Sequence, residues 1–71
     1  MSVAKVIELT ATSKTSFEDA IQQGVARASK TLKNVQGAWI KEQQVEVEDG
    51  KITGYRVNLM VTFVLDGGVE D

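Results

Sequence analysis

Two long strand-like stretches joined by a tight turn constrain this sequence more than any other feature. Asp49 and Gly50 are the kind of dipeptide that favours a two-residue type I′ turn. The flanking stretches, residues 38–48 and 51–65, are rich in β-branched and other apolar residues. The pattern therefore predicts a long β-hairpin, and the rest of the chain must fold around it.

This turn also predicts which residues of the two strands face one another. Counted outward from the turn, the predicted pairs are Glu48 with Lys51, Val47 with Ile52, Gln43 with Arg56, Lys41 with Asn58 and Trp39 with Met60. One face of the last strand is then an almost unbroken apolar row of Tyr55, Val57, Leu59, Val61, Phe63 and Leu65. The opposite face of the hairpin carries Trp39, Lys41, Gln43, Val45 and Val47 beside Arg56, Asn58, Met60, Thr62 and Val64.

The residues before the hairpin predict one more strand and one helix. Residues 3–10 alternate in the manner of a strand, with Ile7 and Leu9 on one face. Ser16 is a suitable N-cap for a helix over residues 17–33, because its side-chain oxygen can accept a hydrogen bond from the first turn. The apolar stripe of this helix comprises Phe17, Ala20, Ile21, Val25, Ala28, Leu32 and Val35.

These elements combine into an α+β fold of the order β-α-β-β. The helical connection returns the chain, so that the first two strands run parallel, and the third strand is antiparallel to both. The third strand is the most apolar and suits the central position. We therefore predict a three-stranded antiparallel sheet in the order 1-3-2, wrapped on one helix. Residues 1–66 are predicted to form a single domain and residues 67–71 an acidic flexible tail.

The composition narrows the function. The chain of 71 residues contains neither cysteine nor histidine, which excludes thiolate nucleophiles and imidazole bases and disfavours a zinc site. We therefore predict no enzyme activity, no catalytic residues and no metal-binding residues. A net charge of −2 argues against nucleic acid, and no apolar run reaches the length of a membrane span. We expect a cytoplasmic protein, which at this size needs self-association for stability.

One helix covers only one face of a sheet, so the other face needs a partner. That face would expose Trp39, Met60, Val45, Val47 and Val64. Apolar patches of this kind usually mark contact surfaces. Two alternatives follow: Trp39 anchors a contact between the subunits of a homo-oligomer, or it lines a pocket between subunits and stacks on a planar ligand.

The stretches KVIELTATSKTSFEDAIQQGVARASKTLKN and VEDGKITGYRVNLMVTFVLD resemble the dodecins. The likeness covers residues 2–66, and the combination of SFEDAI with the later RASKTLKN is specific. This resemblance implies the β-α-β-β fold and assembly into a hollow homododecamer, built from trimers. It also implies a flavin, riboflavin or FMN, as the stored ligand.

Against the flavin site that the resemblance implies, this sequence differs at all four matched positions. The tryptophan that stacks on the isoalloxazine in flavin-binding dodecins corresponds to Gly37 here. Trp39 follows two residues later, on the same face but displaced by about 6 to 7 Å. Arg56 replaces the family's glutamine and offers donors without an acceptor. Two arginines of many bacterial dodecins correspond to Gln44 and Val64.

Two functions therefore remain open. In the first, the chain is a small-molecule binding and storage protein, with a flavin cofactor held by Trp39, Arg56, Gln43 and Gln44. In the second, it is a non-flavin assembly protein whose uncovered face is entirely subunit contact, with cations bound on symmetry axes.

The acidic residues at the hairpin tip bear on the second alternative. Glu46, Glu48 and Asp49 lack the spacing and the terminal glutamate of an EF-hand loop. They are predicted to form a solvated tip in one subunit. In an assembly, the carboxylates of several symmetry-related subunits together would bind a cation that those of one subunit could not hold.

Overall fold

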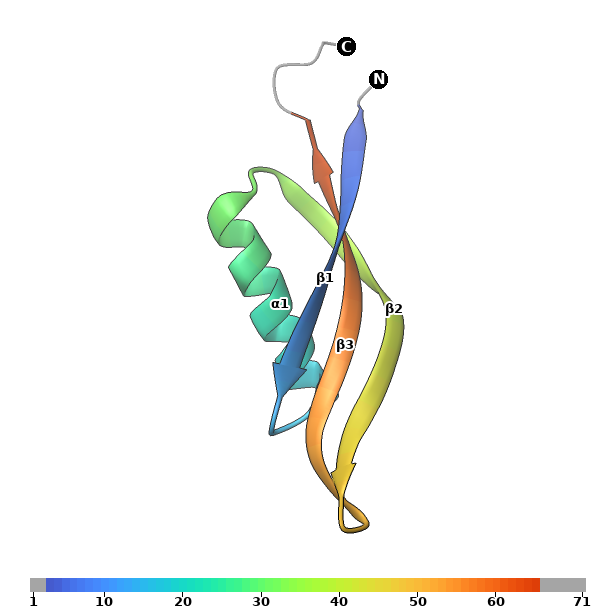
Figure 1. Ribbon diagram of the computed structural model, residues 1–71. Coiled ribbons are helices and arrows are strands. Elements are labelled where there is room, and N and C mark those ends of the chain that lie inside the picture. The colour runs from blue at the N-terminus through green and yellow to red at the C-terminus, as the bar shows by residue number, and fades with distance from the viewer. Residues whose placement is uncertain (1–2, 66–71) are drawn as a thin grey trace.

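The computed structural model describes residues 3–65, which form three strands and one helix (Figure 1). The elements are β1 (Ala4–Ser13), α1 (Phe17–Thr31), β2 (Val35–Glu48) and β3 (Lys51–Val64). β3 lies between β1 and β2 and is antiparallel to both. The predicted β-α-β-β fold with strand order 1-3-2 is confirmed. The predicted domain end at residue 66 and the predicted tail lie outside the described residues.

The strands and the helix differ from their predicted lengths at the connections. β1 extends through Ser13, because the small residues after Thr10 continue to pair with β3. The helix ends at Thr31, two residues earlier than predicted. Asn34 then adopts a left-handed conformation (φ 62°), and its carbonyl accepts a hydrogen bond from the amide of Val64 (3.1 Å). This tie to β3 starts β2 at Val35, three residues before the predicted start.

Two serines fix the start of the helix. Ser16 is the N-cap, as predicted, and its Oγ accepts from the amide of Asp19 (3.0 Å). The buried Ser13 donates from Oγ to Oδ2 of Asp19 (2.6 Å) and accepts from the amide of Thr15 (2.9 Å). The end of β1 is therefore tied to the first turn of α1. Within residues 3–65, no helix is long and apolar enough to cross a membrane.

The core lies between α1 and one face of the sheet. Its buried apolar side chains are Ala20, Ala28, Val57, Leu59 and Val61. Gly24 lets the helix approach closely, because a methyl group at this position would collide with Cδ1 of Leu59. At the start of the helix, Phe17 packs edge-to-face on Tyr55, with ring centroids 5.1 Å apart. The core is small, and only three of these buried side chains are larger than alanine.

A β-bulge near the hairpin tip changes the predicted register. The two pairs next to the turn form as predicted. Thr53 is an extra residue on β3, so Gln44 rather than Gln43 faces Arg56. Gln43 and Val45 consequently lie on the face of the sheet that α1 covers, and their predicted placement on the opposite face is wrong.

A second bulge restores the predicted register farther along. Lys41 is an extra residue on β2, so Glu42 rather than Lys41 faces Asn58, and the predicted pair of Lys41 with Asn58 is wrong. Beyond this bulge, Trp39 faces Met60 as predicted. A third irregularity lies between Val35 and Gly37.

The hairpin extends past the other elements as an arm, residues 46–54. β1 reaches only as far as Tyr55 of β3, so the arm has two strands, and Figure 1 shows it projecting beyond the start of α1. Its turn has positive φ at Asp49 (52°) and Gly50 (75°), as a type I′ turn requires. Val47 and Ile52 face each other in the arm and are 60% and 54% exposed.

The alternation along β2 places Val47 on the same side as Val45, which is the helix side. The prediction that Val47 lies on the opposite face is therefore wrong as well. A free two-stranded ribbon is marginally stable in water. The arm is thus a segment that no other described element of the same copy supports.

Candidate functional site on the open face of the sheet

The face of the sheet turned away from α1, hereafter the open face, is the candidate site. The strand pairing assigns to it the following residues: Val6, Glu8, Thr10 and Thr12 of β1; Arg56, Asn58, Met60, Thr62 and Val64 of β3; Gly37, Trp39, Glu42, Gln44 and Glu46 of β2. These side chains change in character along the strands. They are mainly apolar around Trp39, polar in the middle and charged where the arm begins.

Trp39 presents the largest aromatic surface on the open face. It is 52% exposed and lies beside Met60, whose other neighbour across the sheet is Glu8. Gly37 lies on the same face two residues earlier, and a methyl group there would meet no atom within 4 Å. The shared face of Gly37 and Trp39 is the one predicted from the sequence. The exposed indole of Trp39 lies beside Gly37, which has no side chain, and can therefore stack on a planar ligand.

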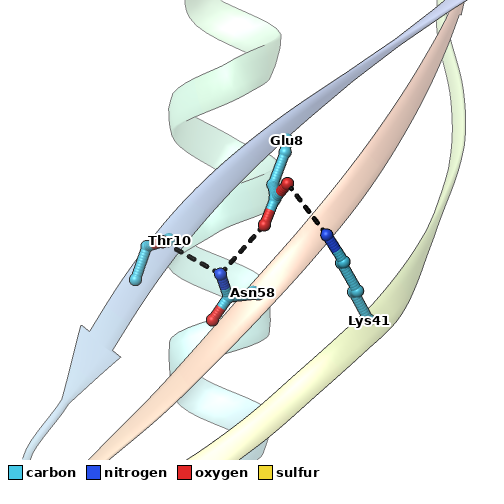
Figure 2. A network of polar contacts seen from close by, with 4 residues as sticks. All are labelled: Glu8, Thr10, Lys41 and Asn58. Atoms are coloured by element: carbon cyan, nitrogen blue, oxygen red, sulfur yellow. Dashed lines mark hydrogen bonds and ion pairs between the residues drawn. The ribbon is translucent and has the colours of Figure 1, made fainter.

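A polar network crosses the middle of the open face (Figure 2). Glu8 of β1 accepts from Nδ2 of Asn58 on β3 (3.0 Å) and forms an ion pair with Nζ of Lys41 on β2 (3.3 Å). Asn58 also donates to Oγ1 of Thr10 (3.4 Å). The bulge at Lys41 is what aims this side chain across β3 toward β1. All three strands are thus connected on the face turned away from α1.

This network stabilises the ionised form of Glu8. The hydrogen bond from Asn58 lowers the pKa of Glu8 below its ordinary value of 4.5, and the hydrogen bond and charge of Lys41 lower it further. Partial desolvation opposes these effects and is the smallest of them. Glu8 is therefore a fixed negative charge between the aromatic and the charged parts of the open face.

A second ion pair lies where the arm begins. Nη2 of Arg56 is 2.7 Å from Oε2 of Glu46, on the neighbouring strand. Nε of Arg56 is buried and has no hydrogen-bond partner among residues 3–65. Gln44 lies opposite Arg56 on β2, and Thr12 lies opposite it on β1. The guanidinium is thus held by a carboxylate and flanked by neutral polar side chains.

Gly54 makes this ion pair possible. It is buried and faces Glu46 across the two strands. A methyl group on Gly54 would lie 2.5 Å from Oε1 of Glu46, so the glutamate side chain lies flat across β3. Thr53, the extra residue of the bulge, donates from Oγ1 to the carbonyl of Glu46 (3.3 Å). The bulge and the glycine together aim Glu46 at Arg56.

The structure separates the four residues predicted to hold a ligand. Gln44 and Arg56 lie together on the open face, Trp39 lies on the same face, and Gln43 lies on the helix side. Met60, the partner of Trp39, is four residues from Arg56 on β3, which corresponds to about 13 Å along a strand. One copy of the chain therefore offers an aromatic part and a polar part, with the network of Glu8 between them.

Glu46 is a site residue that the sequence did not identify as a partner of Arg56. The available signal was Gly54, because a glycine inside a strand often marks a close approach by another group. The hairpin-tip carboxylates are the other acidic candidates from the sequence, as cation ligands shared between subunits. Within residues 3–65, no three acidic side chains come close enough together to hold a metal ion.

Comparison with known proteins gives consistent matches over nearly the whole chain. The family model Dodecin matches residues 3–66. A curated relative, the calcium dodecin of Mycobacterium tuberculosis, is 44% identical over 64 residues, which are 89% of this chain and 89% of the relative.

Two crystal structures extend the comparison. An arginine-to-alanine mutant of the Thermus thermophilus dodecin is 36% identical, with a TM-score of 0.87 over 93% of this chain and 98% of that one. The M. tuberculosis calcium dodecin, described as a calcium-chelating antigen with a novel calcium-binding site, is 37% identical, with a TM-score of 0.79 over 99% and 100% of the two chains.

Proposed function

Because the chain belongs to the dodecin family, we propose that it assembles into a shell of twelve subunits and stores a flavin, riboflavin or FMN, on its open face. The observation that carries the proposal is Trp39. Its indole is half exposed on a sheet face that no helix or strand among residues 3–65 covers. An aromatic surface of this kind is stabilised by stacking on a planar ring or by packing on another subunit.

Self-assembly is supported by what one subunit leaves uncovered. The open face, the arm at residues 46–54 and the outer edges of β1 and β2 all lack partners within the described chain. Unpaired strand edges and a marginal two-stranded arm are stabilised when another copy packs on them. A homo-oligomer supplies such copies without any further partner, and neither nucleic acid nor membrane enters the proposal.

We assign the ligand contacts to Trp39, Gln44 and Arg56. Trp39 stacks on the isoalloxazine, Arg56 donates to a ring carbonyl, and the amide of Gln44 can both donate and accept. In one copy, the backbone positions of Trp39 and Arg56 lie about 13 Å apart along the strands. We therefore place the site between subunits, with Trp39 from one subunit and Gln44 and Arg56 from another. Gln43, on the helix side of the sheet, makes no ligand contact in this assignment.

A second candidate function is cation binding. It is favoured by the 44% identical relative, whose name is calcium dodecin. In this chain, the arm carries Glu46, Glu48 and Asp49, and one subunit does not gather three of its acidic residues into a metal site within residues 3–65. A cation would therefore need carboxylates from several subunits around a symmetry axis.

Native mass spectrometry tests both candidates in one experiment. Spectra are recorded for the protein alone, with riboflavin, with FMN and with calcium, because each spectrum reports both the assembly and the bound mass. We expect a twelve-subunit ion with discrete flavin additions. We further expect Trp39→Ala to lose these additions and Val45→Ala, on the same strand but on the helix side, to keep them.

The outcomes separate the alternatives. A twelve-subunit ion that gains calcium and no flavin would replace flavin storage by cation binding. A smaller assembly would contradict the shell, and an assembly with neither addition would contradict both ligands. Flavin additions that persist in Trp39→Ala would remove Trp39 from the site.

A further inference from the structure

Both basic side chains in the three-stranded part of the open face are already paired with carboxylates within the described chain. Lys41 pairs with Glu8, and Arg56 pairs with Glu46. Lys51 faces the same side, but it lies at the hairpin tip, five residues from Arg56 on β3 and so about 16 Å away. Among residues 3–65, the region that holds Trp39, Gln44 and Arg56 therefore has no unpaired basic side chain.

The pair of Glu46 with Arg56 is built into the strands. Gly54 leaves the space in which the Glu46 side chain lies, and the bulge at Thr53 sets the register that places Glu46 beside Arg56. Glycine is unfavourable inside a strand unless the missing side chain serves a purpose. Here the missing side chain allows the carboxylate to reach the guanidinium.

We propose that Glu46 determines ligand specificity: by occupying Arg56, it makes the open-face site select an uncharged planar ring over the same ring carrying a phosphate. The inference rests on the proposed function, since it concerns the same ligand site. A free arginine is a strong bidentate partner for phosphate. The pair of Glu46 with Arg56 has no net charge, and a phosphate that approaches it meets the carboxylate.

A neutral ring does not meet this obstacle. A ring carbonyl can accept from a guanidinium N–H that Glu46 leaves free, because arginine has five donors and only Nη2 is used by Glu46. The carboxylate of Glu46 can in turn accept from a ring N–H. The two side chains together thus offer the donor and the acceptor that Arg56 alone does not.

Riboflavin and FMN are the matched probes, because they differ only by the phosphate. Their affinities for the assembled protein are measured by quenching of flavin fluorescence at low salt. We expect the wild-type protein to bind riboflavin at least as tightly as FMN. Glu46→Gln frees Arg56, and we expect it to raise the affinity for FMN relative to riboflavin by about tenfold, the size of one charge-assisted hydrogen bond.

Two further variants show whether the ion pair is the cause. Gly54→Ala displaces Glu46 without changing the net charge, so it should shift the affinity ratio toward FMN as well. Glu42→Gln removes the same charge from the same strand and the same face, but Glu42 forms no ion pair with another described residue. We expect it to change the ratio by less than about twofold.

The failure of this inference is distinguishable from the failure of the proposed function. If the wild-type protein binds neither flavin, flavin storage is wrong and this inference falls with it. If it binds flavin and prefers FMN, or if the ratio is the same in the wild type, Glu46→Gln and Gly54→Ala, flavin storage stands and the role of Glu46 is overturned.

Discussion

The two faces of β3 show how differently one strand is used in this protein. Val57, Leu59 and Val61 point toward α1 and are fully buried, whereas the alternate residues face away from α1 and stay partly exposed. The covered face is held by close packing and by Gly24, which brings the helix against Leu59. The open face is held by hydrogen bonds and two ion pairs between strands.

This difference indicates what each face is for. The part of the apolar face that packs under α1 is complete within one copy, because Val57, Leu59 and Val61 find their contacts inside the chain. Exposed ion pairs contribute little to stability. A half-exposed tryptophan also contributes less to stability than a buried one, because much of its apolar surface stays in water. The open face is therefore a surface that other molecules complete, and mutations on the two faces should differ in kind as well as in size.

Leu59→Ala should give the largest effect, because it removes a fully buried side chain from the core. We expect a loss of about 2–5 kcal/mol in the free energy of unfolding, measured by urea denaturation. Thr62→Ala, on the opposite face of the same strand, is the matched control and should cost far less. Equal losses in the two variants would contradict the distinction between the faces.

If Trp39 anchors a subunit contact instead of stacking on a flavin, Trp39→Ala should act on assembly more than on the fold. A central aromatic residue of a subunit contact typically contributes about 2 kcal/mol or more to association. We therefore expect a smaller or more readily dissociated assembly in analytical ultracentrifugation and a lower melting temperature. Trp39→Phe keeps an aromatic ring and should retain part of the contact. An unchanged assembly size and melting temperature in Trp39→Ala would show that Trp39 is not a subunit contact.

Ser16→Ala tests how the covered face depends on the start of the helix. It removes the hydrogen bond from the amide of Asp19 to the N-cap oxygen, and the expected loss is about 1 kcal/mol in the free energy of unfolding. Ser29→Ala changes an exposed serine inside the same helix and should be close to neutral. Assembly should be unaffected in both variants, since neither residue lies on the open face.

Most of the fold followed from the sequence, because strong local signals agreed with the global arrangement. Asp49 and Gly50 fixed the turn, Ser16 fixed the start of the helix, and the apolar row of β3 fixed its central place. These features depend only on the residue types and on the spacing of the apolar residues, and both can be seen in a single sequence.

The middle of the open face did not follow, because β-bulges leave no clear signal in the residue pattern. Thr53 adds one residue to β3 and Lys41 adds one residue to β2. The two register shifts are opposite, so the predicted pairing is restored at Trp39 and Met60. Register counted from the turn was therefore right at both ends and wrong between them. That error put Gln43 beside Arg56 and hid the contact of Glu46 with Arg56.

Glu8→Gln should have the smallest effect on the melting temperature. The pH dependence of this effect distinguishes a role of the Glu8 charge from a role of its shape. The pKa of Glu8 is lowered in the folded protein, chiefly by the hydrogen bond from Asn58 and then by Lys41. A lowered pKa means that the ionised carboxylate stabilises the fold above its unfolded pKa, near 4.5, and that this stabilisation is lost as the pH falls through the folded pKa.

We therefore expect Glu8→Gln to lower the melting temperature slightly at pH 7 and to match the wild-type protein in acid, well below pH 4.5. Glu42→Gln is the control, because it removes an open-face carboxylate outside the network. Its difference in melting temperature from the wild type should not disappear in acid in the same way. A difference between Glu8→Gln and the wild type that stayed constant from pH 7 into acid would mean that Glu8 acts through its shape and not through its charge. The polar network would then be a spacer between the two parts of the open face rather than an electrostatic link between the strands.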